Sequence, residues 1–249
     1  MGRWSRPVAR EFLVWLDPSP RLRWLDVGCG TGALTSEILA LQSAAPSAVL
    51  AVDASPAFVE HARASVPDHR VRFEAAVAEE LPAEDATFDV VVSGLLLNFV
   101  RDPLAAVRQM ARVARRGGVV ASYVWDYAGE MQPLRHFWEA VLAVVPSAAE
   151  LDEVRRFALC KPEPLRALFV DAGLEDVEVT AIERRTTFRD FEDYWSPFLA
   201  GQGAAPGYLM SLPERDRLAV EESVRRLLPR NLDGSIELVT RAWAVGGRS

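Results

Sequence analysis

A glycine cluster that follows an acidic residue is the part of the sequence best suited to bind a ligand. The segment LDVGCGTG, residues 25–32, places glycines at positions 28, 30 and 32. Glycine there lets the backbone turn tightly and lets a ligand approach without meeting a Cβ atom. The dinucleotide-binding fingerprint advances three residues from its second to its third glycine, whereas this loop advances two, and Ala33 stands where that fingerprint ends. Because alanine is sometimes tolerated there, the spacing alone does not exclude a dinucleotide.

The charge beside the loop separates the candidate ligands further. Asp26 immediately precedes the first glycine. A pyrophosphate is held by amide groups at a helix N-terminus and is disfavoured by a neighbouring carboxylate. A cationic ligand without phosphate, such as S-adenosylmethionine with its ammonium and sulfonium groups, is attracted by that carboxylate. Asp53 ends the next apolar run and is placed to accept hydrogen bonds from two ribose hydroxyls.

The elements that position these residues form a regular alternation of strands and helices. Apolar runs predict strands at 22–27, 48–52, 71–73, 88–93, 119–125, 177–182 and 236–245. Helical spacing predicts helices at 33–41, 56–64, 103–115 and 164–172. The third of these begins at Pro103 behind the N-cap Asp102, and Gly117 and Gly118 are expected to stop it. This order predicts an α/β fold whose mostly parallel sheet has helices on both faces.

We expect one domain over residues 1–249, because this length is near the upper end of what one core holds. Residues 21–125 are the predicted cofactor-binding core, and 161–187 and 234–249 complete its sheet. The amphipathic segment 1–20 is a predicted N-terminal cap helix. The segments 126–160 and 188–233 break the alternation and are rich in aromatics, Pro and Gly. We expect them to be helical insertions that cap the carboxyl edge of the sheet.

Composition excludes several classes of protein. The formal net charge is −7, and basic residues are interspersed with acidic ones, so nucleic acid is not expected as a partner. The sequence contains no secretory signal and no apolar span of membrane length, which predicts no membrane insertion. Its two cysteines have no metal-type spacing, and a reduced, cytoplasmic protein is expected. No pattern indicates an oligomeric state.

Four segments in order carry a family resemblance: LDVGCGTG, AVDASPAFVEHAR, EELP and TFDVVVSGLLLNF. They resemble the first four motifs of class I S-adenosylmethionine-dependent methyltransferases. Within that class they are most similar to the small-molecule group that includes the quinone-biosynthesis enzymes. The resemblance covers roughly residues 22–125. It implies a Rossmann-like fold with a seven-stranded sheet, S-adenosylmethionine as the cofactor and S-adenosylhomocysteine as the product.

The resemblance also implies roles at the strand ends. The glycine loop would line the methionine and ribose portions of the cofactor, Asp53 would hold the ribose, and Ala54 and Phe58 would flank the adenine. Val77 and Ala78 stand where the family usually has an Asp-Ala pair, so the Ala78 amide, together with Glu79, would have to contact the adenine amino group. The complete implied set of cofactor-binding residues is Trp4, Asp26, Gly28, Cys29, Gly30, Gly32, Asp53, Ala54, Phe58, Val77, Ala78, Glu79, Ser93, Gly94, Leu95 and Asn98.

The end of the fourth strand is expected to lie beside the reactive group. Ser93 to Asn98 would lie near the sulfonium, with Gly94 and Leu95 near the methyl that is transferred. Enzymes that methylate exocyclic base amines often carry an Asn/Asp-Pro-Pro-aromatic motif there, whereas this chain has SGLL. That difference again argues against nucleic acid as the acceptor. Ser93 is the single oxygen ligand that this strand end offers, so no metal is predicted.

Candidate groups on the acceptor side are few. His136 is the one histidine in a predicted cap segment and is the candidate general base, with packing as the alternative role. A base is needed when a neutral hydroxyl attacks, but not when a phenolate, an enol or a free amine does. The candidate substrate-pocket residues are Asp126, Tyr127, Tyr194, Trp195 and Tyr208.

The sequence therefore favours methyl transfer from S-adenosylmethionine to an oxygen, carbon or nitrogen atom of a small, partly apolar metabolite. Two alternatives stay open. One is a protein that binds S-adenosylmethionine without catalysis, and the other is a dinucleotide-dependent oxidoreductase, which Asp26 and the glycine spacing oppose. No motif encodes the acceptor or the methylated atom.

Overall fold

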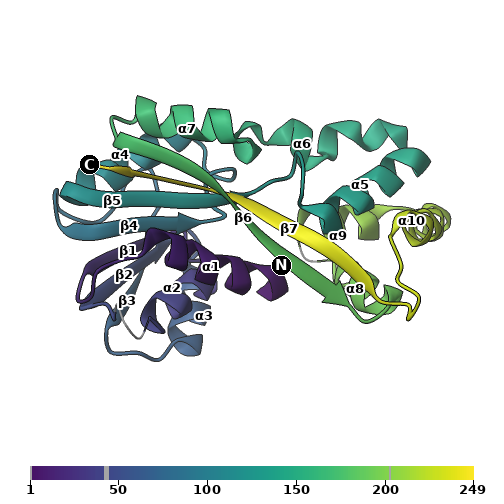
Figure 1. The fold of residues 1–249 in the computed structure, drawn as a ribbon, viewed down its shortest axis with the longest axis horizontal. Coiled ribbons are helices and arrows are strands. Elements are labelled where there is room, and N and C mark those ends of the chain that lie inside the picture. Colours follow the sequence, from purple (N-terminus) through teal and green to yellow (C-terminus); the bar gives the residue numbers. More distant parts are fainter. Residues whose placement is uncertain (1, 42–44, 202) are drawn as a thin grey trace. The chain divides into compact units, whose positions relative to one another are not determined.

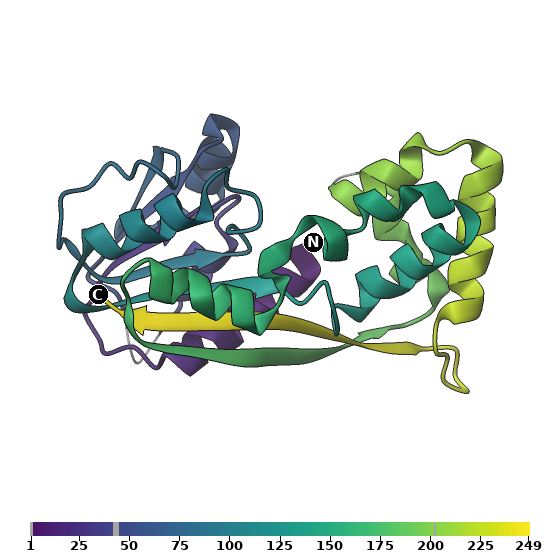
Figure 2. The ribbon, with the colours of Figure 1, turned by 90° about the horizontal axis from the view of Figure 1, so that it is seen from above.

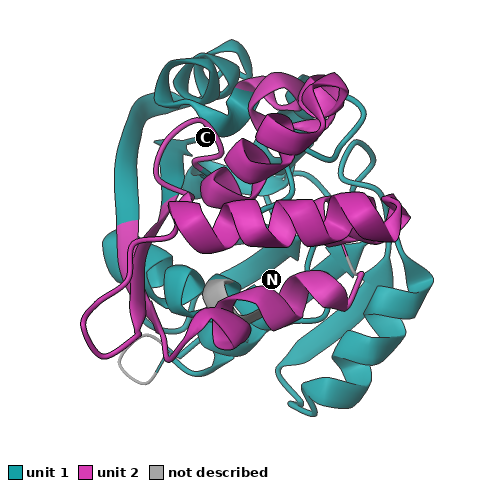
Figure 3. Ribbon diagram, turned by 90° about the vertical axis from the view of Figure 1, so that its right-hand side faces the viewer, with its two compact units in different colours: residues 1–125, 159–182, 242–249 teal, residues 126–158, 183–241 magenta. Residues whose placement is uncertain are grey.

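The chain divides into two compact units, shown in different colours in Figure 3. The computed structural model describes residues 2–41, 45–201 and 203–249, and of residues 2–4 it describes the backbone alone. Unit 1 comprises residues 1–125, 159–182 and 242–249, and unit 2 comprises residues 126–158 and 183–241. The segments expected as insertions, 126–160 and 188–233, fall largely in unit 2. That they are insertions into a single domain stays a prediction.

Seven strands of the described residues form one sheet (Figure 1). In chain order they are β1 (Arg23–Val27), β2 (Ala48–Asp53), β3 (Val71–Ala75), β4 (Phe88–Gly94), β5 (Ala114–Trp125), β6 (Glu175–Phe188) and β7 (Ile236–Arg248). Their order across the sheet is β3-β2-β1-β4-β5-β7-β6. The first five are parallel, and β7 runs antiparallel to β5. The predicted Rossmann-like, mostly parallel sheet is confirmed.

Helices cover both faces of the sheet in unit 1 (Figures 1 and 2). They are α1 (Gly2–Leu16), α2 (Ala33–Leu39) and α3 (Pro56–Ser65) on one face, and α4 (Pro103–Val113) and α7 (Pro162–Asp171) on the other. Alternate strand residues face the two layers, as the period of a strand requires. Leu25 and Val27 of β1 belong to a buried cluster with Met110 of α4 and Phe169 of α7. On the other face, Ala51 of β2 packs in a cluster with residues of α3.

The start of α4 and its end differ in how well the sequence predicted them. Asp102 is the N-cap, and its Oδ1 accepts a hydrogen bond from the Ala105 amide at 3.0 Å, as predicted. The predicted end near Arg115 is wrong, because α4 ends at Val113 and β5 begins at Ala114. Gly117 and Gly118 lie inside β5. They lie in an irregular part of the strand, where Gly117 has a φ of +73° and the pairing with β4 shifts register between Ala114 and Val119. Ala114 pairs with Phe88 of β4, and the Gly117 amide donates to the Ser249 carbonyl at 2.7 Å.

Unit 2 is built mainly from helices around an aromatic core. Its helices are α5 (Gln132–Val144), η1 (Pro146–Leu151), α6 (Glu153–Arg156), α8 (Phe191–Leu199), α9 (Ala204–Ser211) and α10 (Glu214–Leu227), and the short η2 (Ala158–Cys160) begins at its boundary with unit 1. The rings of Phe137 and Phe198 stack with centroids 4.8 Å apart, and those of Phe191 and Trp195 stack at 5.8 Å. Within the described residues, no helix has the length and apolar character that a membrane span needs.

Candidate functional site

The glycine loop joins β1 to α2 and is held against the end of β2. The amides of Gly28 and Cys29 both donate to the Val52 carbonyl, at 2.8 and 2.9 Å. Gly28 has a φ of +74°, and a Cβ atom at this position would lie 2.7 Å from the Leu96 side chain. Both features require glycine, since side-chain-bearing residues rarely adopt this φ and a methyl group there has no room. The loop backbone is therefore shaped to leave space at the carboxyl edge of the sheet.

Asp53 fixes the loop to the end of β2. Its Oδ2 accepts a hydrogen bond from the Gly30 amide at 2.9 Å, and its Oδ1 accepts one from the Ser55 amide at 2.8 Å. A carboxylate oxygen can accept more than one hydrogen bond, so both oxygens keep capacity for a ligand's hydroxyls. Asp53 is partly exposed, which fits the role predicted for it at a ribose.

Asp26 is the acid near the loop whose pKa is most strongly shifted. Its side chain is fully buried, and Oδ2 accepts a hydrogen bond from the Thr35 hydroxyl at 2.6 Å. Oδ1 is buried and has no hydrogen-bond partner among the described residues. Burial raises the pKa of Asp26 to about 7, against the lowering effect of the Thr35 hydrogen bond, and the Asp53 charge raises it further. A cation placed beside it would favour the ionised form.

Cys29 lies in the same loop but is not suited to act as a nucleophile. The side chain is buried, and burial raises the pKa of its thiol. The charges of Asp26 and Asp53 raise the pKa further. Because the thiolate is the reactive form, a thiol held protonated in this way is inert.

A cavity of about 180 Å³ opens beside the loop in unit 1. It brings together six of the predicted cofactor residues from three separate segments: Gly28, Asp53, Ala54, Val77, Ala78 and Glu79. The other lining residues are Ala76, Leu96, Phe99, Val100 and Arg101, none of which was named individually as a cofactor residue. Leu96 and Phe99 lie inside the fourth motif, and Val100 and Arg101 directly follow it, so that motif is the signal that could have found them. Phe99 is 60 % exposed, which is unusual for a large apolar side chain.

The predicted cofactor residues also differ in their hydrogen bonds and in their exposure. Glu79 uses Oε1 to accept hydrogen bonds from the amides of Arg101 and Asp102, at 3.0 and 3.2 Å, so it holds the loop after β4. Ser93 is buried, with its hydroxyl 2.8 Å from that of Ser122. Asn98 is partly exposed, and Phe58 is half exposed on α3. The side chain of Trp4 lies outside the described part of the chain.

The end of β4 has unusual backbone geometry. Gly94 is the last residue of the strand, and Leu95 follows with a φ of +61°, a left-handed conformation that is rare for leucine. The Leu95 amide donates to the Tyr123 carbonyl at 2.8 Å, which keeps the turn against β5. Strained residues of this kind cluster at functional sites, and this turn is the one predicted to face the reactive methyl.

The predicted acceptor-side residues lie in unit 2. Asp126 accepts hydrogen bonds from the Glu130 amide and Arg241, at 2.9 and 3.4 Å, so its carboxylate is paired. Tyr194 is buried and donates to the Pro133 carbonyl at 2.7 Å, and Trp195 packs in the same aromatic core.

Of the remaining three, Tyr208 and His136 are partly exposed and Tyr127 is buried. Tyr208 stacks on Trp138 with centroids 5.7 Å apart, and Tyr127 packs on Phe157 at 5.5 Å. His136 is partly exposed on α5, and its Nδ1 is buried without a hydrogen-bond partner among the described residues. Burial lowers the pKa of His136, so its imidazole is neutral at pH 7 and able to accept a proton.

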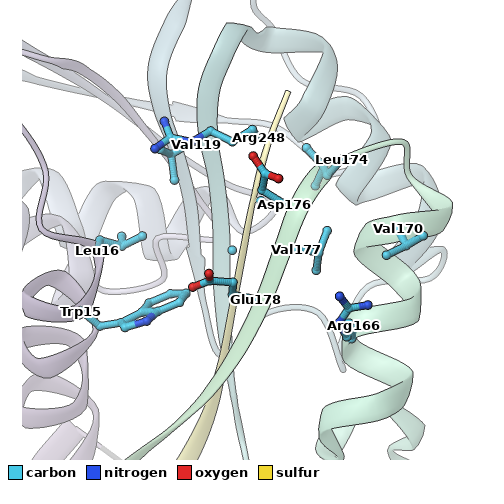
Figure 4. A pocket seen from close by; sticks show the side chains of 12 residues that line it. Trp15, Leu16, Val119, Arg166, Val170, Leu174, Asp176, Val177, Glu178 and Arg248 are labelled. Carbon is cyan, nitrogen blue, oxygen red and sulfur yellow. The ribbon is translucent and has the colours of Figure 1, made fainter.

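A larger groove of about 810 Å³ in unit 1 contains none of the predicted site residues. Figure 4 shows Trp15 of α1 on one side of it and Arg166 and Val170 of α7 on the other, with the strands β6 and β7 between them. Asp176 and Glu178 lie opposite two arginines in its lining, so it presents no net charge of one sign. Over the described residues, no group of three or more His, Cys, Asp or Glu side chains is arranged to hold a metal ion.

The fold and the site together define a class of protein. A parallel sheet binds ligands outside the carboxyl ends of its strands, at the point where the strand order reverses. Here that point lies between β1 and β4, and the glycine loop, Asp53 and the cavity lie beside it. This arrangement is typical of Rossmann-like domains that bind a nucleotide-type cofactor. The unpaired oxygen of Asp26 and the cradle at Gly28 fit a cofactor with a cationic group.

Comparison with known sequences identifies the family. Residues 25–122 match the model of the methyltransferase domain family. The malonyl-[acyl-carrier protein] O-methyltransferase of Halorhodospira halophila is 32 % identical, over 98 % of this chain and 82 % of that protein. The demethylmenaquinone methyltransferase of Roseiflexus castenholzii is 35 % identical over about half of each chain. The chain belongs to the methyltransferase family, and its cofactor is S-adenosylmethionine.

Solved structures show the same fold at lower sequence identity. A methyltransferase-type protein from Bacillus halodurans superposes with a TM-score of 0.62 at 17 % identity, over 96 % of this chain and 97 % of the other. The YcgJ protein of Bacillus subtilis does so with a TM-score of 0.60 at 19 % identity, over 98 % of both chains. The family model and the sequence relatives, which are methyltransferases, disfavour the dinucleotide-dependent oxidoreductase that was considered from the sequence.

Proposed function

We propose that this enzyme transfers the methyl group of S-adenosylmethionine to an oxygen, carbon or nitrogen atom of a small, partly apolar metabolite. The observation that carries the proposal is the cavity in which Gly28, Asp53 and residues 76–79 meet, in a chain of this family. The relatives' names give a carrier-bound malonyl group and a demethylated quinone as acceptors. Tyr208, which is partly exposed and stacks on Trp138, is suited to contact an acceptor that is partly apolar.

The residues would divide the work as follows. Asp53 would accept hydrogen bonds from the ribose hydroxyls, and the Ala78 amide would contact the adenine. Bound S-adenosylmethionine supplies both the methyl group and a good leaving group, so the protein has mainly to orient the acceptor in line with the sulfur–methyl bond and exclude water. For a hydroxyl acceptor, neutral His136 would take the proton that the oxygen loses.

The acceptor is not nucleic acid in this proposal, and the protein acts in the cytoplasm. A net charge of −7 with interspersed arginines supports the first point, because phosphate binding needs clustered positive charge. The second point is supported by the two cysteines, which are buried and not joined to each other in a disulfide. No metal takes part in the proposed reaction.

Calorimetric titration of the purified protein with S-adenosylmethionine, S-adenosylhomocysteine and NAD tests the cofactor part of the proposal. We expect micromolar binding of both sulfur ligands and none of NAD. Asp53→Ala should abolish the binding by removing the ribose acceptors, whereas Asp85→Ala should leave it unchanged, since Asp85 is exposed and pairs with Arg112 outside the cavity. Binding of NAD alone would contradict the proposal.

An acceptor screen then tests the catalytic part. Formation of S-adenosylhomocysteine is followed with carboxylate-, phenol-, quinol- and amine-bearing metabolites. An enzyme yields this product with at least one acceptor class. A protein that only binds the cofactor yields it with none of them, and that result would favour the non-catalytic alternative.

A further inference from the structure

Tyr123 of β5 lies across the last residue of β4. Gly94 and Tyr123 are paired neighbours in the sheet. A Cβ atom at Gly94 would lie 2.5 Å from the Tyr123 hydroxyl oxygen and 2.8 Å from the ring carbon that bears it. The phenol therefore occupies the place that a side chain at position 94 would take. A ligand that reaches Gly94 on this face meets the phenol oxygen.

The ring of Tyr123 is fixed from the other side by α1. Its centroid lies 4.8 Å from that of Phe12, which is fully buried. This packing holds the ring and leaves its polar end pointing to the carboxyl edge of the sheet. No hydrogen bond of the Tyr123 hydroxyl is found among the described residues. Its oxygen is not one of the buried polar atoms that lack a partner, so it keeps some accessible surface at which a ligand can donate to it.

The electrostatic surroundings of the hydroxyl are acidic. Burial raises the pKa of Tyr123, and the charges of Asp26 and Glu37 raise it further, so the phenol stays neutral. Asp26 is on β1, on the other side of β4 from Tyr123, and its Oδ1 also lacks a partner. A cationic hydrogen-bond donor such as an ammonium group is favoured here by the accessible Tyr123 oxygen, by the unpaired Oδ1 of Asp26 and by the negative potential beside the glycine loop.

We propose that Tyr123 is a cofactor-binding residue whose hydroxyl oxygen accepts a hydrogen bond from the ammonium group of S-adenosylmethionine. The residue at position 94 is glycine because the phenol fills the space above it. Tyr123 lies on the fifth strand, outside the four motifs that carry the family resemblance. This inference deepens the proposed function and rests on it, because it names a contact within the same cofactor site.

The test compares wild type with Tyr123→Phe, which removes the oxygen and keeps the ring against Phe12. Calorimetry measures the dissociation constants of S-adenosylhomocysteine, of its deaminated analogue, and of 5′-methylthioadenosine, which lacks the whole amino-acid portion. A hydrogen bond to a charged group is worth about 1.5–3 kcal/mol, so we expect the variant to bind S-adenosylhomocysteine about ten- to a hundredfold more weakly. The two ligands without the ammonium group should bind both proteins equally.

Each other outcome has its own meaning. Equal affinity of wild type and variant for S-adenosylhomocysteine would overturn the inference. So would an equal loss for all three ligands, because that pattern would show that Tyr123 only supports the shape of the site. Failure of the wild-type protein to bind S-adenosylhomocysteine would instead contradict the proposed function, and the two failures are thereby distinguished.

Discussion

At the scale of single residues, Asp26 combines two properties that proteins seldom tolerate together. Its side chain is wholly buried, and one of its oxygens has no hydrogen-bond partner among the described residues. A buried, unpaired carboxylate is costly, and the folded protein reduces that cost by raising the pKa so that the group is partly protonated at neutral pH. The site therefore keeps an acid that is ready to ionise when a cation binds nearby.

Asp26→Asn should change how stability depends on pH. The pKa of Asp26 is raised from 3.8 to about 7, so its contribution to stability is fully present below pH 4 and is lost as pH rises to 7. A shift of about three units corresponds to roughly 4 kcal/mol. The free energies of unfolding of variant and wild type are measured by urea denaturation across pH. Between pH 4 and pH 7 the value for the asparagine variant should rise relative to that for wild type, and above pH 7 the difference between them should stay constant. A difference independent of pH would contradict a raised pKa.

His136→Gln tests the proposed base. If a hydroxyl is the acceptor, we expect kcat to fall by about 10²–10⁴-fold, with the affinity for S-adenosylhomocysteine unchanged. Because burial lowers the pKa of His136, the kcat of wild type should decline only at pH values below the ordinary titration range of histidine. The kcat of the variant should not show this decline. His61→Gln on α3 is the matched control and should keep wild-type activity. An unchanged kcat in the His136 variant would assign this residue to packing.

The sequence located residues that stand at a strand end and missed those whose position at the edge of the sheet depends on packing. Asp26, Gly28 and Asp53 were predictable because an apolar run and a glycine loop locate the carboxyl edge. The place of Phe99 in the cavity was not predictable, although it ends the fourth motif, because a large apolar side chain is usually buried. The left-handed φ of Leu95 was not predictable either, since nothing in a leucine indicates it. The contact of Tyr123 with Gly94 likewise arises from side-chain direction across two strands.

At the scale of elements, the two ends of α4 show what local sequence can decide. Its start was predictable because Asp102 and Pro103 act within one turn of chain. Its end was not, because Gly117 and Gly118 stop a helix and also suit an irregular strand. The pairing of Ala114 with Phe88, a contact between residues far apart in the sequence, decides for the strand. Boundaries set by such tertiary contacts are hidden from local patterns.

The glycine loop allows a matched comparison of two substitutions. Gly28→Ala and Gly30→Ala both place a side chain at positive φ, +74° and +53°, which costs roughly 1–2 kcal/mol. At Gly28 the new methyl also meets Leu96 at 2.7 Å, whereas at Gly30 nothing lies within 4 Å. We expect Gly28→Ala to lower the free energy of unfolding by the larger amount.

Leu96→Ala supplies the control for that comparison. Combined with Gly28→Ala, it should cost less than the sum of the single changes, because it removes the atoms that the new methyl meets. All the variants are compared by urea denaturation. Equal costs at positions 28 and 30 would show that the Leu96 contact does not constrain the loop.

At the scale of the whole molecule, the sequence predicted the parallel part of the sheet more completely than the extent of its last two strands. The alternation of elements up to residue 125 implied the parallel strands. The last two strands were predicted as 177–182 and 236–245, but β6 and β7 are longer and contribute residues to both units. The additional residues of β6 are largely charged and exposed, and those of β7 are Gly246, Gly247 and Arg248, so no apolar pattern marks them. Contacts within the fold place unit 2 at 126–158 and 183–241, close to the segments that their aromatic, Pro and Gly content had marked.

Because every residue of the cofactor cavity belongs to unit 1, the ligand should act on that unit first. S-adenosylhomocysteine at a hundred times its dissociation constant stabilises a protein that binds it only when folded by about 2.7 kcal/mol. Amide hydrogen exchange should slow in residues 28–32, 53–54, 76–79 and 94–101, and Asp53→Ala should remove the effect. Helix α10 of unit 2 contributes nothing to the cavity, so it serves as the internal reference. Protection of α10 without protection of the glycine loop would show that the ligand binds elsewhere.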